Sequence, residues 1–168
     1  GLAEIVNGIS NCLYLGNLNA KRDWGHAKDY VEMQWLMLQQ KKPKDFVIST
    51  GKVYSVRDFV LEAAKQIGLE IKFRGKGSNE IGYVNKIKKG LNYKIKKNQV
   101  VIRVDKKYIR PSEVDVLHGD SKLAKKELKW KSKISFKDLV KDMVSHDMKL
   151  INEKIFLEKY HSQLNKNK

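Results

Sequence analysis

The sequence predicts an α/β fold, because short apolar stretches of strand length alternate along the chain with longer stretches of helical periodicity. The length of 168 residues and the content of 41% hydrophobic and 9% aromatic residues fit one globular domain with a real core. The chain is therefore expected to be ordered despite its high charge.

The N-terminal segment predicts a helix, a strand and a loop. Apolar residues at helical spacing predict a helix over 2–8, and we expect the sequence to start, at Gly1, within a longer helix. Residues 12–15 form a short apolar strand that Gly16 closes, and the polar residues 17–25 predict a loop.

A second helix is expected over 26–42, where apolar residues recur at turn spacing up to Pro43. The apolar run 46–49 predicts a buried strand. Ser55 and Asp58 are spaced as a capping box, so the next helix should begin there and bury its apolar stripe.

The remaining chain continues the alternation. Residues 69–73 alternate as a half-exposed strand, and residues 75–98, rich in glycine and lysine, predict a variable excursion. Three further elements follow: a strand over 100–104, a short helix capped by Asp120, and a long helix over 136–155 capped by Ser135.

The net charge of +16 raises the question of nucleic-acid binding. Only five of the 35 basic residues are arginine, and the lysines are spread almost evenly. Specific phosphate and base recognition favours arginine. We find no zinc-ligand spacing, aromatic RNA-binding motif or helix-turn-helix, so nucleic acid is the least favoured partner.

Other classes are excluded more simply. The single Cys12 precludes a disulfide framework and suits a reducing cytoplasm, and no apolar run is long enough to span a bilayer. The four histidines are scattered, so no metal site is expected; His26 is interpreted as a helix-start residue. The three tryptophans are interpreted as core or loop anchors.

Two arginines in polar loops beside helix starts are the best candidates for binding. Arg22 and Arg110 would suit a diphosphate if their guanidinium groups converged on one cleft. From spacing alone, Arg22 with Asp23 could also be a local ion pair, and the Arg110-Pro111 pair only a turn at a helix start.

Six runs of residues carry a resemblance to a known family. They are Cys12–Leu18, Arg22–Val31, Gln34–Gln40, Arg110–Glu113, Gly119–Ala124 and Leu128–Ser132. In content, order and spacing they are similar to the extended short-chain dehydrogenase/reductases, and most closely to the GDP-mannose 4,6-dehydratase family. Lys129 stands where that family usually has glycine, and Ser132 where it has proline.

The resemblance implies the roles of four residues. It assigns Arg22 and Arg110 to the diphosphate of GDP-mannose and Glu113 to the ribose hydroxyls, which a carboxylate suits by its two acceptor oxygens. Asn17 would border the guanosine. No catalytic, cofactor-binding or metal-binding residue is assigned.

The resemblance also implies what these residues lack. The resemblance implies a family of lyases that convert GDP-mannose to GDP-4-keto-6-deoxymannose with NADP. This reaction belongs to the biosynthesis of GDP-fucose and other deoxyhexoses. A glycine-rich phosphate loop is absent, since Glu80 stands where the third glycine after Gly75 and Gly77 should be. The one Tyr-x-x-x-Lys match, Tyr93 to Lys97, is expected by chance. The chain alone should therefore be inactive.

The expected organisation is a C-terminal substrate-binding lobe over 1–160 and a polar tail over 161–168. Residues 26–50 should pack on an N-terminal Rossmann half outside this chain, which would bind NADP in a cytoplasmic homodimer or homotetramer. The alternatives are a fragment of a related sugar-nucleotide epimerase or dehydratase, a GDP-binding module without chemistry and, last, a basic nucleic-acid binder.

Overall fold

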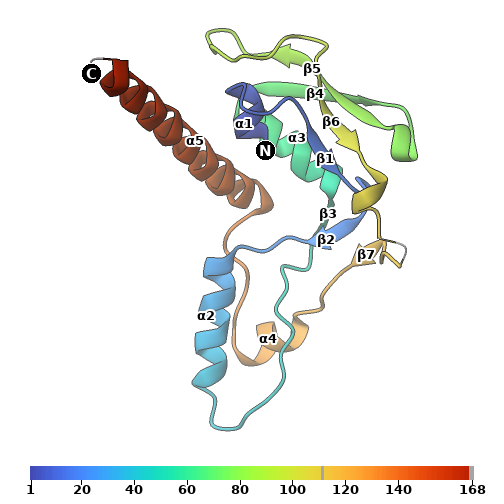
Figure 1. The fold of residues 1–168 in the computed structure, drawn as a ribbon. Helices are drawn as coiled ribbons and strands as arrows, with labels where there is room; N and C mark the ends of the chain where they lie inside the picture. Colours follow the sequence, from blue (N-terminus) through green and yellow to red (C-terminus); the bar gives the residue numbers. More distant parts are fainter. Residues whose placement is uncertain (111, 167–168) are drawn as a thin grey trace.

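The computed structural model describes residues 1–110 and 112–166, and it confirms the α/β class (Figure 1). The strands form two separate sheets. One has four strands in the order β1-β6-β5-β4, and the other has three strands in the order β3-β2-β7. The second sheet lies near the middle of the molecule, between the four-stranded sheet and the helical part that contains α2 and α4.

The four-stranded sheet confirms the strands expected over 12–15, 69–73 and 100–104. It consists of β1 (Leu13–Leu15), β6 (Val100–Val104), β5 (Ile81–Ile87) and β4 (Leu69–Arg74). β1 runs parallel to β6, and β5 is antiparallel to both β6 and β4. The excursion expected over 75–98 is therefore wrong for β5, whose partners on both sides make it a central strand.

α1 (Leu2–Val6) and α3 (Val56–Gln66) cover one face of this sheet, and α5 (Phe136–Lys166) packs on these two helices (Figure 1). The largest fully buried side chains in this core include Ile5, Val84 and Ile102. In β4, Leu69 and Ile71 are buried, while the residues that alternate with them are exposed. The opposite face of the sheet is therefore open to solvent.

The capping box at Ser55 is confirmed. The Ser55 hydroxyl accepts a hydrogen bond from the backbone N–H of Asp58 at 3.0 Å, and the Asp58 carboxylate accepts the Ser55 N–H at 2.8 Å. The hydrogen bonds to Ser55 lower the pKa of Asp58, because they favour its charged form. The sequence signal and the structure agree here because the motif is local.

The three-stranded sheet was not anticipated. β2 (Lys21–Asp23) lies between antiparallel β3 (Val53–Ser55) and parallel β7 (Val116–Leu117), so the loop expected over 17–25 is wrong at its centre. β2 consists of three polar residues and has no strand-like pattern of its own. Its ladder depends on two segments that are distant in the sequence.

The second helix, α2 (Ala27–Leu38), begins after His26 as expected but ends four residues before the expected Lys42. The strand expected over 46–49 is also wrong, because residues 43–50 have no ladder partner among the described residues and adopt no regular structure. Ser49 is nevertheless buried. An apolar run becomes a strand only beside another strand.

Two further differences concern helix ends. The short helix α4 (Lys122–Glu127) has Ser121 rather than Asp120 at its N-cap, although the Asp120 carboxylate does accept the N–H of Lys122. α5 continues through Lys166, so residues 161–166 of the expected polar tail are helical. Residues 167–168 lie outside the described part of the chain.

A buried carboxylate joins α2 to the segment after α4. Asp29, 3% exposed, accepts hydrogen bonds from the Ser132 hydroxyl and from the backbone N–H groups of Lys133 and Ile134, at 2.9–3.0 Å. The indole of Trp130 donates to the Asp29 carbonyl at 3.0 Å. Ser132 thus supplies a donor that the proline usual at this position lacks.

Of the three tryptophans, two are anchors as expected. Trp130 is 2% exposed, and Trp24 packs on Phe59 with ring centroids 4.9 Å apart. Trp35 is 59% exposed on α2, so the expectation is wrong for this residue in the described chain.

Lys129 follows α4 with φ +55°, in the left-handed region that favours glycine. A lysine there is strained by roughly 1 kcal/mol. We therefore expect Lys129→Gly to raise the free energy of unfolding by about 1 kcal/mol, measured by urea denaturation. The matched control is Lys131→Gly, at an exposed position without positive φ, which should bring no gain; equal effects of the two changes would contradict the interpretation.

Candidate functional site

A cavity of about 340 Å³ lies between the loop after β1 and the segment that follows β6. Asn17, Arg110 and Glu113, three of the four residues assigned to binding by the resemblance, line it together with Asn19 and Glu80. Residues nearly one hundred positions apart are thus brought to one hollow by the parallel pairing of β1 with β6.

Gly16 permits the close approach of the two segments. A Cβ atom at this position would collide with the backbone carbonyl of Tyr108, so any other residue would push the loop 16–19 away. Within the loop, the side-chain oxygen of Asn17 accepts the N–H of Asn19 at 2.9 Å. This turn presents the Asn17 side chain beside the cavity.

Glu113 has two carboxylate oxygens in different situations. Oε1 accepts from Nη2 of Arg22 at 3.2 Å, whereas Oε2 is buried and has no hydrogen-bond partner among the described residues. A buried acceptor without a partner costs free energy unless a ligand or water satisfies it. Glu113, which lines the cavity, therefore has one acceptor atom without a partner among the described residues.

Arg22, on β2, is held by three acceptors. Its Nη1 donates to the carbonyls of Lys21 and Val114 at 2.8 and 2.9 Å, and Nη2 donates to Glu113. Arg22 is not among the residues that line the cavity. The two arginines thus differ in this structure. Arg22 donates a hydrogen bond to Glu113 without lining the cavity, whereas Arg110 lines the cavity.

Arg110 is exposed and makes no hydrogen bond or ion pair within the part of the chain that the structure describes. Its guanidinium group is available to an anion that enters the cavity. The neighbouring Pro111, part of the expected turn, lies outside the described residues.

Asp23 does not form the local ion pair with Arg22 that spacing alone left open. Its carboxylate accepts from the N–H groups of Thr50 and Gly51 and from the Thr50 hydroxyl, at 2.6–2.9 Å. Asp23 therefore fixes the turn before β3, and Arg22 remains oriented toward Glu113.

Sequence reasoning missed a second ion pair at the cavity. Arg57 binds both carboxylate oxygens of Glu80 at 2.6 and 3.0 Å, and its Nη2 also donates to the Asn19 side chain at 3.0 Å. Its guanidinium group lies 4.7 Å from the centre of the Phe73 ring. No local pattern marks this contact, because its partners lie on a loop and at the start of β5.

Other side chains that the sequence left outside the site have structural partners. The Tyr93 hydroxyl donates to the Ile67 carbonyl at 2.9 Å, and burial raises its pKa, so it is no paired catalytic tyrosine. Cys12 is half-buried, and desolvation raises the pKa of its thiol, which disfavours the reactive thiolate.

Two classes of site have no support in the described residues. No group of three or more His, Cys, Asp or Glu side chains there is arranged to hold a metal ion. None of the described helices is long and apolar enough to cross a membrane.

Comparisons with known proteins agree with this arrangement. Residues 1–143 match the family model described as GDP-mannose 4,6 dehydratase. The chain is 46% identical to GDP-mannose 4,6-dehydratase of Vibrio cholerae serotype O1 over 165 residues, covering 98% of the chain and 44% of that protein. It is 51% identical to the Dictyostelium discoideum protein and 49% identical to the human one, covering 89% of the chain and 39% and 38% of those proteins.

Solved structures show the same fold at lower identity. RMD from Pseudomonas aeruginosa complexed with NADPH matches with a TM-score of 0.63 and 15% identity, over 88% of the chain and 40% of that structure. A UDP-glucose-4-epimerase from Stenotrophomonas maltophila matches with a TM-score of 0.61 and 16% identity, over 90% of the chain and 39% of that structure. The chain spans less than half the length of the relatives that it matches.

The interpretation of His26 as a helix-start residue is confirmed, because His26 caps α2. The same side chain also connects α2 to α5. Nδ1 accepts the N–H of Lys28 at 3.1 Å, so Nε2 carries the hydrogen that is donated to Asp142 of α5, also at 3.1 Å. This hydrogen bond is the largest of the causes that lower the pKa of the Asp142 carboxyl. A depressed folded-state pKa stabilises the fold at pH values above the unfolded-state pKa, and this stabilisation is lost as the pH falls.

We therefore expect Asp142→Asn to reduce the free energy of unfolding at pH 7 and to make no difference once the pH falls well below about 4. Urea denaturation of both proteins between pH 7 and pH 2.5 measures this. A wild-type advantage that persists unchanged at the lowest pH would show that the contact does not depend on the charge of Asp142.

Proposed function

Because the chain belongs to the GDP-mannose 4,6-dehydratase family, we propose that it is the substrate-binding part of such an enzyme, which converts GDP-mannose to GDP-4-keto-6-deoxymannose. The observation that carries the proposal is the cavity itself. Among the described residues, it combines a cation without an ion-pair partner, Arg110, with the buried, unpartnered oxygen of Glu113 and a polar loop around Asn17. A nucleoside diphosphate offers the complementary groups: phosphate charge, ribose hydroxyls and a polar base.

Each side chain has a distinct task in this proposal. Arg110 binds the diphosphate, since a guanidinium group offers several donors to phosphate oxygens. Glu113 Oε2 accepts a hydrogen bond from a ribose hydroxyl, and Asn17 borders the guanine. Arg22 orients Glu113 through its hydrogen bond to Oε1, rather than reaching the diphosphate directly.

The residues of this chain do not fit NADP, the cofactor that the family uses. Gly75 and Gly77 lie in the connection between antiparallel β4 and β5, which contains one 3-10 turn (Gly77–Asn79) and no α-helix, and Glu80 beyond them is paired with Arg57. We derive no hydride or dehydration step from these side chains. The proposed role of this part is to bind and orient the sugar nucleotide, and the chain alone is expected to be inactive.

A second feature supports a larger enzyme. Val31, Trp35 and Leu38 lie one turn apart on α2 and are 61%, 59% and 82% exposed. We call these three side chains the α2 face. Exposed apolar side chains grouped in this way mark surfaces that another protein part covers. We propose that the α2 face packs against the cofactor-binding half of the enzyme.

Titration of GDP by calorimetry tests the proposed site. We expect GDP to bind more tightly than UDP, and Arg110→Gln and Glu113→Gln each to weaken GDP roughly tenfold or more, because each removes a charged hydrogen bond of about 1.5–3 kcal/mol. Lys141→Gln, on exposed α5, removes the same charge as Arg110→Gln and should leave binding unchanged. Equal binding of GDP and UDP, or equal loss in all three variants, would refute the assignment.

The α2 face has its own test. We expect the double substitution Trp35→Ser and Leu38→Ser to reduce binding of a hydrophobic dye and to lower self-association in light scattering, because it removes exposed apolar area. Ile9→Ser, which removes an exposed apolar side chain from another part of the molecule, is the matched control. A wild-type chain that is monomeric and binds no dye would contradict the proposal.

A further inference from the structure

The open face of the four-stranded sheet carries a row of side chains that do not line the proposed GDP site. The strand register places Tyr14 of β1 beside Arg103 of β6, Arg103 beside Ile81 of β5, and Ile81 beside Arg74 of β4. Residues directly opposite in neighbouring strands project from the same face. One line of alternating aromatic, cationic and aliphatic groups therefore crosses all four strands.

A second row lies next to the first. Lys72 of β4 is paired in register with Tyr83 of β5. The guanidinium group of Arg74 lies over the Tyr83 ring, 5.5 Å from its centre. We call Tyr14, Lys72, Arg74, Tyr83 and Arg103 the sheet-face cluster, in which two tyrosine rings are interleaved with three cations.

The cations of this cluster lack carboxylate partners. Among the described residues, neither Arg74 nor Arg103 forms an ion pair, in contrast to Arg22 and Arg57, which each bind a glutamate. Two carboxylates line the cavity at this face: Glu80 is paired with Arg57, whereas Asp105 accepts the N–H of Lys107 and forms no ion pair among the described residues. The surface therefore presents several cations without carboxylate partners, with the single unpaired carboxylate of Asp105 at its edge.

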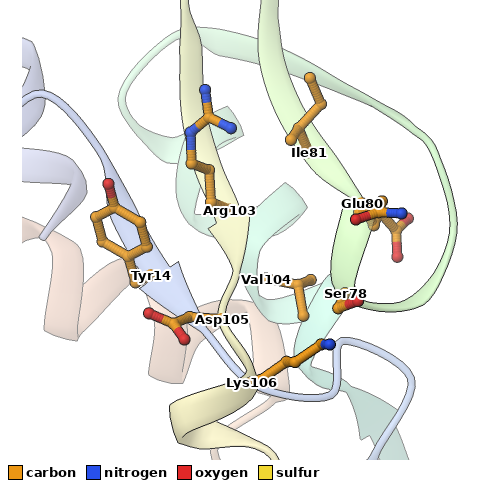
Figure 2. Close-up of a pocket in the computed structure, with 9 residues that line it drawn as sticks. Tyr14, Ser78, Glu80, Ile81, Arg103, Val104, Asp105 and Lys106 are labelled. Atoms are coloured by element: carbon orange, nitrogen blue, oxygen red, sulfur yellow. The ribbon is translucent and has the colours of Figure 1, made fainter.

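The face is also hollowed at one end. A cavity of about 510 Å³ lies where β1 and β6 end, and Tyr14, Ile81 and Arg103 form one side of it (Figure 2). Lys106 and Ser78 lie on the other side, so the row of cations continues past the edge of the sheet. The Ser78 hydroxyl and the Lys106 ammonium group add two hydrogen-bond donors for an anionic ligand.

We propose that the sheet-face cluster binds single-stranded nucleic acid, with phosphates on Arg74, Arg103 and Lys106 and bases stacked on Tyr14 and Tyr83. An open sheet with interleaved cations, an exposed ring at Tyr14 and a partly exposed ring at Tyr83 suits unpaired bases, whose flat faces a duplex hides. A duplex is disfavoured because the face presents neither a helix nor a ribbon to a groove. The overall charge of +16 assists the encounter of the two molecules.

The proposal revises one expectation about charge. The even spread of lysine along the sequence indicated a general bias in composition, and this interpretation still holds for the lysines. The strand pairing gathers two of the five arginines and two of the seven tyrosines onto one surface, which spacing in the sequence does not show. The cavity at this surface adjoins the proposed GDP cavity, since Glu80 and Val104 line both, but no residue of the sheet-face cluster lines the GDP cavity.

Fluorescence anisotropy with a labelled ten-nucleotide oligouridylate and the full chain tests the proposal. We expect the double substitution Arg74→Gln and Arg103→Gln to weaken binding tenfold or more and to reduce the salt slope by about 1.4, as the loss of two phosphate contacts predicts. The matched control, Lys137→Gln with Lys141→Gln on exposed α5, removes the same charge and should change affinity less than twofold.

Two further measurements separate the proposed surface from its alternatives. Tyr14→Ser should weaken binding about fivefold or more without a change of salt slope, because stacking is lost while the charges stay. Duplex RNA and polyglutamate should each bind more weakly than the oligonucleotide. The proposal is overturned if both double substitutions weaken binding equally, or if duplex RNA or polyglutamate binds as well.

Discussion

The arrangement of the site depends on the contact between Arg22 and the segment that follows β6. One guanidinium group donates to the Val114 carbonyl and to Glu113, and thereby joins β2 to a segment that has no regular structure of its own. The pairing of β2 with β7 continues this connection. Without it, Glu113 would lose its orientation, and one wall of the cavity would no longer be defined.

The opposite wall is fixed by a second arginine in the same manner. Arg57, near the start of α3, joins the loop 16–19 to the start of β5 through Asn19 and Glu80. Both ion pairs are partly shielded from water, which strengthens charged hydrogen bonds relative to exposed ones. The cavity thus lies between two arginines with structural roles, and Arg110 is left for the ligand.

The two surfaces proposed for binding differ in physical character. The cavity combines a cation with a buried acceptor and so suits a small molecule with both phosphates and hydroxyl groups. The sheet face offers cations interleaved with aromatic rings across an open area, which suits an extended anionic strand. The α2 face is apolar, and its exposure agrees with a chain that spans less than half of its relatives' length.

The sequence by itself determined the features that arise from neighbouring residues. The capping box of Ser55 and Asp58, the start of α2 at His26, the alternation in β4 and the identity of the family all follow from local patterns. The resemblance of its motifs to a known family also singled out Asn17, Arg110 and Glu113, and the structure brings these three residues to one cavity. Tertiary structure alone decided the rest. β2 and β5 exist because of partners elsewhere in the chain, residues 46–49 are no strand because they have none, and Arg57 reaches Glu80 only when α3 packs beside β5. The physical reason is that strand ladders and ion pairs are made between groups, and their free energy depends on which distant segment lies within hydrogen-bonding distance.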